Sequence, residues 1–190
     1  MEHFEVEGPE KEHIHHEAIH HKNDFATKVA VLTACLATIG AIFNFAAGKA
    51  LAESTMLKNE AAIIKTEAAN QWAYYQAKST KQAIMESSLL NATEPKAESY
   101  FHTHIIRYQQ EKKEIKIQAE KLEKKSNEFS QRSDHVLHIH HRWAEAIAAI
   151  QIAISLAAMS ILTQKQWLFI SSFAVSGIGI ALGIFSFLGF

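Results

Sequence analysis

The sequence predicts an all-α fold: three transmembrane helices with a long antiparallel coiled-coil helical hairpin inserted between spans 1 and 2. Residues 101–154 carry a stripe whose positions lie alternately four and three apart over seven heptads, which is a helical period. Every position of the stripe is apolar or small except Lys112 and His140. The chain has only two Pro and seven Gly in 190 residues, too few turn residues for a sheet. Apolar runs of about 20 residues, the length that crosses a hydrocarbon core, flank a charged middle.

The N-terminal region combines a polar arm with the first predicted span. Residues 1–24 are rich in histidine and have little apolar surface to bury, so we expect a loosely ordered arm. The alternative is a short helix over residues 11–22. Residues 25–47 carry Lys28 as their only charge and form transmembrane helix 1. A cleaved signal peptide is the competing interpretation, because residues 50–52 resemble a cleavage site. The apolar run exceeds the roughly 7–15 residues of such a peptide, so we expect a retained span.

The charged, alanine-rich residues 48–143 are predicted to form the antiparallel helical hairpin, with its turn near 91–97. The arms on either side of this turn are nearly equal in length, which favours antiparallel pairing and sets residue i opposite roughly 189 − i. At 1.5 Å per residue, each arm reaches about 65 Å.

The predicted seam of the hairpin alternates small and large side chains. Its small members are Ala119, Ser126 and Ser133, and its large ones are Ile115, Leu122, Phe129 and Val136. Ala61 and Ala68 repeat the small positions on the first arm. The regular alternation favours close helix packing. The alternative is a solvent-exposed helix with weak seam residues.

Two further spans complete the chain. Residues 144–163 form transmembrane helix 2 and residues 167–190 transmembrane helix 3, with a tight turn between them and Trp167 at the membrane interface. Small side chains are spaced for close contact between helices. In the third span these are Ser172, Ser176, Gly179 and Gly183; in the first they are Ala26, Ala30, Ala34, Ala37 and Ala41.

Two strings of the sequence resemble a known family. They are Trp72-Ala73-Tyr74-Tyr75-Gln76-Ala77-Lys78-Ser79, and the run from His138 to Trp143 that leads into Ala149-Ile150-Gln151-Ile152-Ala153-Ile154. Both resemble the bacterial family called domain of unknown function 4337. The likeness covers about residues 24–190 and includes the order of span, hairpin, span, turn, span. It implies a small three-span bacterial membrane protein, and supplies no activity, substrate or cofactor.

Histidines near the second span are the first candidate site. Asp134, His138, His141 and Glu145 share one face of the predicted helix, and imidazoles with carboxylates suit Zn²⁺ or another divalent ion. We favour the alternative that these amphipathic groups lie at the headgroup level without metal, since two adjacent ligands seldom form a stable site. His140 lies on the seam, and we expect it to pack against the first arm near residues 48–53.

A second histidine face, formed by His13, His16 and His20, lies before the first span. One span separates it from residues 138–141, so the two histidine groups are predicted on opposite sides of the membrane and form no common site within one chain.

The aromatic group Trp72, Tyr74, Tyr75 and Lys78 has two interpretations. It is a docking patch, or it is the aromatic core of the hairpin with tyrosine hydroxyls at its rim, which we favour. The antiparallel relation places Trp72 and Tyr75 opposite residues 112–117.

The predicted function is that of a self-assembling structural scaffold in the bacterial inner membrane, surrounded by lipid. Homo-oligomerisation is expected because a two-helix arm has little core. The alternative is an oligomeric channel or transporter, with a metal ion as one cargo. An enzyme is not expected, since phosphate loops and catalytic triads are absent from the sequence. No catalytic, cofactor or metal residue is assigned. The net charge of −1 indicates no nucleic-acid partner, and the sequence identifies no protein partner for the hairpin.

Overall fold

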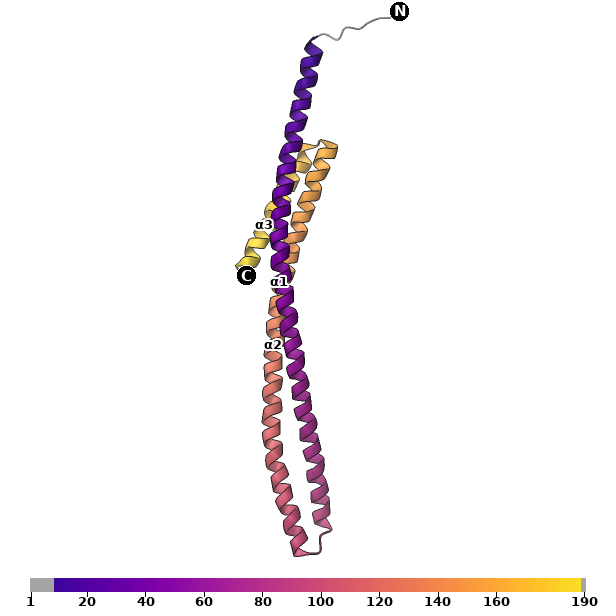
Figure 1. The fold of residues 1–190 in the computed structure, drawn as a ribbon, viewed down its shortest axis with the longest axis vertical. Helices are drawn as coiled ribbons and strands as arrows, with labels where there is room; N and C mark the ends of the chain where they lie inside the picture. The colour runs from indigo at the N-terminus through magenta and orange to yellow at the C-terminus, as the bar shows by residue number, and fades with distance from the viewer. Residues whose placement is uncertain (1–8, 189–190) are drawn as a thin grey trace, which may run out of the picture. The chain divides into compact units, whose positions relative to one another are not determined.

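The computed structural model describes the backbone of residues 9–188 and the side chains of residues 25–188. Over this range the protein consists of three helices and no strand: α1 (Pro9–Leu90), α2 (Pro95–Thr163) and α3 (Gln166–Phe187) (Figure 1). The all-α prediction is confirmed. The side chains of His13, His16 and His20 lie outside the described residues.

Both prolines of the chain are the first residues of helices, Pro9 in α1 and Pro95 in α2. Proline suits this position because it has no N–H to leave unpaired, and its φ is already helical. The prediction of a loosely ordered arm in residues 1–24 is wrong from Pro9 onward. Extending an existing helix avoids the cost of nucleating a new one, so a polar segment continues α1 without an apolar face of its own.

The two connections are short. Residues 91–94 join α1 to α2, where the amide of Asn91 donates to the carbonyl of Ser88 at 3.2 Å. Residues 164–165 join α2 to α3, and Gln164 has a φ of 53°. A left-handed residue directly after a helix is a common way of ending it. Both turns lie where the sequence predicts them.

The chain divides into two compact units. One contains the beginning of α1 up to Ala50, the end of α2 from His138, and α3; the other is Leu51–Leu137. In the first unit, Leu36, Ile150 and Ala153 form a core against which side chains of all three helices pack. Each of the three helices is long and apolar enough to cross a membrane, with a mean hydropathy of 2.0–2.1 over its most apolar part.

In the first unit, most of the buried side chains of α3 are small, and many large apolar side chains are exposed. The buried residues of α3 are Leu168, Ser172, Ser176, Gly179, Gly183 and Ser186. By contrast, Phe45 of α1 is 78% exposed and Leu162 of α2 83% exposed. Large apolar side chains on the outside match a lipid surrounding, in which small residues draw helices together.

The second unit, Leu51–Leu137, is an antiparallel pair formed by the later part of α1 and the earlier part of α2. As residue numbers rise along α1, those of the contacting residues on α2 fall: Ser54 contacts Ser133, Ala61 contacts Ser126, Lys65 contacts Glu123, and Lys78 contacts Glu111. These pairs match the relation predicted from the two arm lengths.

Candidate functional site

The seam of the α1–α2 pair is lined by small side chains. Ala68 and Ala119 are fully buried, and Ala61 and Ser126 are each 5% exposed. The large positions fill the space between them, as Ile64 and Ile115 are also buried. The sequence prediction of small seam residues in close contact is therefore confirmed at these positions.

Serine hydroxyls bond across the seam to the opposite backbone. Ser126 Oγ donates to the carbonyl oxygen of Ala61 at 2.8 Å. Ser54 and Ser133 do so reciprocally, each Oγ donating to the other's carbonyl oxygen at 3.0 and 2.9 Å. A hydroxyl on a one-carbon stem reaches the opposite main chain only where the two helices approach closely. These bonds also satisfy polar groups that would be costly to bury alone.

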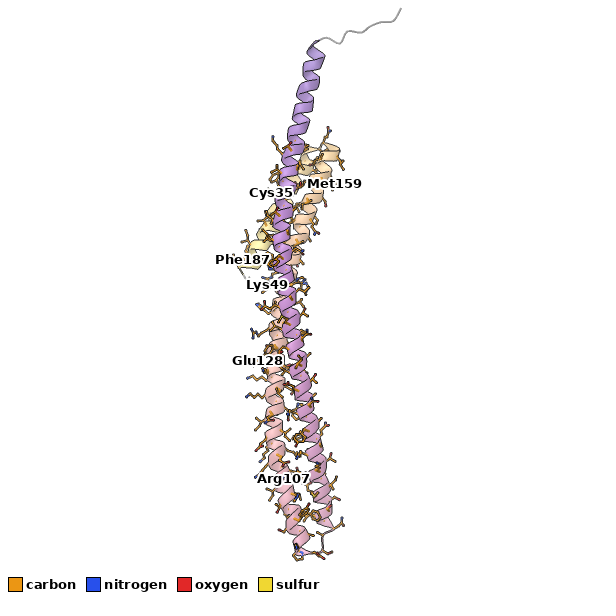
Figure 2. All side chains as sticks on the ribbon, viewed as in Figure 1. Cys35, Lys49, Arg107, Glu128, Met159 and Phe187 are labelled. Atoms are coloured by element: carbon orange, nitrogen blue, oxygen red, sulfur yellow. The ribbon has the colours of Figure 1, made fainter. Side chains whose placement is uncertain are left out.

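A charged cluster lies farther along the same pair. Lys78 is only 9% exposed, and its Nζ lies 2.6 Å from Oε2 of Glu111. The other carboxylate oxygen of Glu111 accepts from Nε of Arg107 at 2.7 Å. The ammonium also lies 5.2 Å from the ring centre of Tyr74 and 5.5 Å from that of Tyr108. Arg107 is labelled in Figure 2 on α2.

These contacts shift the pKa values of the cluster in the directions that favour ion pairing. The hydrogen bond from Lys78, followed by that from Arg107, lowers the pKa of the Glu111 carboxyl. The hydrogen bond to Glu111 raises the pKa of the Lys78 ammonium against the opposing effect of burial, and the Tyr74 hydroxyl adds to the rise. The two shifts stabilise the ion-paired state of Lys78 and Glu111.

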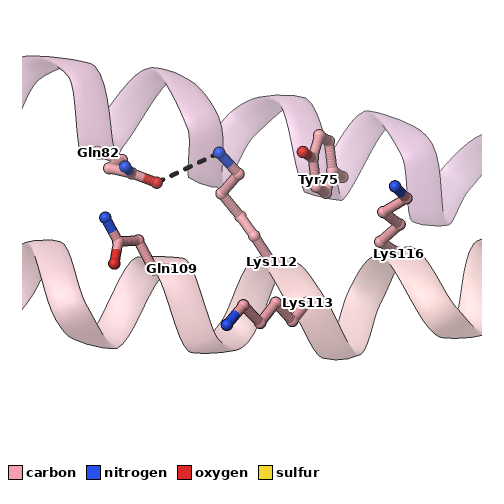
Figure 3. Close-up of a pocket in the computed structure, with 6 residues that line it drawn as sticks. All are labelled: Tyr75, Gln82, Gln109, Lys112, Lys113 and Lys116. Carbon is pink, nitrogen blue, oxygen red and sulfur yellow. Dashed lines mark hydrogen bonds between the residues drawn. The ribbon is translucent and has the colours of Figure 1, made fainter.

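Beside this cluster, Lys112 of α2 reaches across to α1. Its Nζ donates to Oε1 of Gln82 at 3.2 Å and lies 5.1 Å from the ring centre of Tyr75. Figure 3 shows this side chain bridging the two helices, with Lys113 and Lys116 at the edge of the same notch. The notch is open. Lys112 is held by its contacts with α1, and Lys116 pairs with Glu120 of its own helix at 3.7 Å.

The predicted aromatic group is split by the structure. Trp72 and Tyr75 are half-buried and contact each other edge to face, with ring centres 5.7 Å apart. Tyr74 is 52% exposed. Tyr75 meets Lys112, within the range predicted to face it. These positions match the interpretation as hairpin core with tyrosine at the rim.

The four residues of the predicted histidine face all lie on α2, at the helical spacing that the sequence predicts. Asp134, in the Leu51–Leu137 unit, pairs with Lys58 at 3.3 Å. His138, His141 and Glu145 are exposed side chains of the other unit. No group of three or more His, Cys, Asp or Glu side chains suited to a metal ion occurs among residues 25–188.

His140 has a separate, structural contact. Its ring is half-buried, and Nδ1 lies 2.9 Å from the carbonyl oxygen of Ala47. A carbonyl only accepts, so Nδ1 carries the proton in this bond. The contact lies one residue before the region of the first arm that was predicted to face it.

Gly179 and Gly183 of α3 lie against the other two helices of their unit, as predicted. A Cβ added to Gly179 would lie 3.1 Å from the Cβ of Ala149 and 3.2 Å from the carbonyl oxygen of Ala146, both on α2. A Cβ on Gly183 would clash with the Phe43 ring of α1. The prediction that the alanines of the first span make similar contacts is wrong within the chain, because Ala30, Ala34, Ala37 and Ala41 are all exposed.

Two features escaped the sequence analysis: the Ser54 layer and the buried Lys78–Glu111 pair. The signal for both is the antiparallel relation between the arms. Applied to residue 78 it indicates residue 111, and applied to residue 54 it falls within two positions of residue 133. Opposite charges at such positions indicate a cross-helix pair.

Comparison with known protein families gives a match over most of the chain. Residues 25–189 match the model of a family described as Domain of unknown function (DUF4337). No curated protein and no solved structure matches the chain.

Proposed function

This chain belongs to the family named for the domain of unknown function 4337, and we propose that it is an integral membrane protein acting as a self-assembling structural scaffold. The three spans are residues 25–47, 144–163 and 167–190, and the α1–α2 pair is a helical hairpin inserted between the first two. The support for membrane insertion is the set of three long apolar helices. Their small buried residues and large exposed ones add to it. The resemblance of the sequence to bacterial proteins points to the inner membrane.

The observation that carries the scaffold role is the seam of the α1–α2 pair. Serine hydroxyls bond to the opposite backbone at two levels, Ser54–Ser133 and Ser126–Ala61. Salt bridges Lys65–Glu123 and Lys78–Glu111 follow at further levels. Cross-helix bonds at successive levels resist sliding and separation of the two helices. Such a rigid pair suits a scaffold, because it holds its far end at a fixed position.

The alternative function, an ion channel, requires polar side chains inside the bundle of spans. Ion pathways in membranes are lined by ionisable or strongly polar groups that face the interior of a bundle. The charged side chains of the three spans are Lys28 and Glu145, each near the end of its span, and both are exposed. A scaffold needs no such lining.

Particle images and light scattering of the full chain in detergent test the proposal, together with ion flux in liposomes. We expect a homo-oligomer of defined mass that causes no ion flux across the liposome membrane. A ring of spans around a pore, with ion flux through it, would instead establish the channel. A monomer at all concentrations would exclude self-assembly.

A further inference from the structure

The exposed side of α1 carries a regular uncharged stripe. Between Ala52 and Ser87, eleven positions alternate four and three residues apart, and every one is exposed. We call these the outer stripe: Ala52, Met56, Asn59, Ile63, Thr66, Asn70, Ala73, Ala77, Thr80, Ile84 and Ser87. A heptad repeat without charge over about 54 Å is the pattern of a helix that packs against another helix.

The outer stripe lies opposite the seam with α2. Each of its members follows a seam position by two residues, as Ile63 follows Ala61 and Thr66 follows Ile64. Two residues rotate a helix by about 200°, so the two faces lie back to back. A second helix can occupy the outer stripe without disturbing the seam.

Covering the outer stripe leaves few polar groups without partners. The hydroxyls of Thr66 and Thr80 already donate to carbonyl oxygens of their own helix, at 3.0 and 3.1 Å. Lys58, Lys65 and Lys78, which lie off the stripe, pair with carboxylates of α2. The main cost of covering a polar surface, lost hydration, is therefore small here.

The corresponding outer side of α2 does not match this stripe. It carries Arg107, Glu114, Lys121, Lys124 and Glu128, all exposed. Burying charges against an uncharged helix is costly, so between the two outer faces of the Leu51–Leu137 unit another outer stripe is the better match for α1. With the flanking positions such a contact comprises about 20 residues a side, the size of a stable protein interface.

We propose that two copies of this chain pair through their α1 outer stripes, with the two helices parallel. In a parallel pair Met56, Ile63, Asn70, Ala77 and Ile84 meet their own counterparts. The Asn70 amide both donates and accepts, so two copies bond to each other across the two-fold axis, which fixes register and pairing.

The flanking charges are compatible with this pairing. In the parallel register the position beside Glu60 is Thr55 of the copy, and the position beside Glu67 is Ala62 of the copy, so no glutamate meets another. The parallel direction rests on the proposed function, because copies anchored in one membrane point the same way. The match between uncharged stripes does not depend on it.

Cysteine cross-linking of the full chain in the membranes of expressing cells tests the pairing. Cys35 is exposed and is first replaced by serine. Ile84→Cys then reports a parallel pair, since antiparallel helices centred near Asn70 would hold two such cysteines roughly 40 Å apart. Ile117→Cys on α2 is the matched control, because Ile84 and Ile117 are 54% and 65% exposed.

Under mild oxidation we expect roughly tenfold more disulfide-linked dimer from Ile84→Cys than from Ile117→Cys. Adding Ile63→Glu should remove this difference, whereas adding Gln110→Glu on α2 should preserve it. Equal cross-linking at residues 84 and 117 would overturn the pairing. Cross-linking by Asn70→Cys but not by Ile84→Cys would overturn the parallel direction. Recovery of the unmodified chain in the soluble fraction is a separate result, which would contradict the proposed function instead.

Discussion

The hydroxyl of Ser126 donates a 2.8 Å hydrogen bond to the carbonyl oxygen of Ala61 on the opposite helix. Ser126 is 5% exposed, so a larger side chain at this position has no space. We expect Ser126→Leu to destabilise the pair by about 1–3 kcal/mol through overpacking. Hydrogen exchange of the Leu51–Leu137 amides in the full chain measures the change.

A matched control for this substitution is Gln131→Leu, at an exposed position of the same helix. Its effect should stay within about 0.5 kcal/mol. If Ser126→Leu slowed exchange, leucine would be filling free space, and the close approach of the helices at this layer would be wrong.

The α1–α2 pair could be predicted from the sequence because its seam residues repeat at heptad spacing. The antiparallel register follows from one turn and two nearly equal arms, and it places Tyr75 opposite Lys112 as observed. The burial of Ala119 and Ser126 follows from their heptad spacing. Local periodicity suffices in both cases, because the partner of each helix is the next helix in the chain.

Contacts among the three helices of the first unit were harder to predict. Small residues recur on several faces of α1, and spacing does not indicate which face meets a partner. The observed contact uses large side chains of α1 against small ones of α3, as Phe43 shows where it packs over Gly183. One small partner is enough for a close approach, so Ala30, Ala34, Ala37 and Ala41 stay exposed within the chain.

The Lys78–Glu111 pair predicts a dependence of stability on pH. The pKa of Glu111 is lowered in the folded pair, so its contribution is present above the ordinary glutamate pKa and is lost as pH falls through the lowered value. The pKa of Lys78 is raised, so its contribution is present below the ordinary lysine pKa and is lost as pH rises through the raised value. The contribution of this pair to stability should therefore be level between about pH 5 and pH 10.

Thermal melting of the full chain across pH, followed by circular dichroism, measures this profile. Glu111→Gln should lower the melting temperature at neutral pH, because the buried ammonium of Lys78 loses its charged partner. It should also weaken the fall of the melting temperature at acid pH, because the carboxylate that titrates there is gone. Glu114→Gln, at an exposed position on the same helix, is the control and should change neither. If the melting temperature of Glu111→Gln fell at acid pH as steeply as that of the unmodified chain, the acid sensitivity would belong to other carboxylates.

The glycines of α3 predict that the same substitution at two nearby positions, 177 and 179, has different effects on stability. A Cβ on Gly179 meets the backbone of α2, whereas a Cβ on Gly177 meets nothing within 4 Å. Gly179→Leu should cost about 1–3 kcal/mol or displace α3, because a backbone oxygen cannot move aside as a side chain does. Gly177→Leu should be tolerated. Apparent melting temperatures in detergent compare the two, and equal losses would contradict the described contact of Gly179.

The exposed histidines near the second span predict a protein without bound metal. His138 and His141 are one helical turn apart and supply only two ligands, fewer than a stable zinc site requires. Elemental analysis of untagged protein purified without chelator should find metal far below one ion per chain. Near-stoichiometric metal that disappears in His138→Ala would reveal a site completed by a second chain.

Membrane topology is predicted from the short segments that flank the spans. Lys11, Lys22, Lys28 and Lys165 lie on one side of the predicted spans, and no charged residue follows Lys165. The hairpin is longer than about 60 residues, so its own lysines contribute little to orientation. We therefore expect the N-terminus in the cytoplasm, with the hairpin and the C-terminus outside.

Thr93 lies between α1 and α2 and is exposed, so a reporter fused there perturbs neither helix. A reporter active only in the periplasm should function at Thr93 and fail at the N-terminus. Silence at Thr93 with activity from a cytoplasmic reporter at the same position would reverse the orientation.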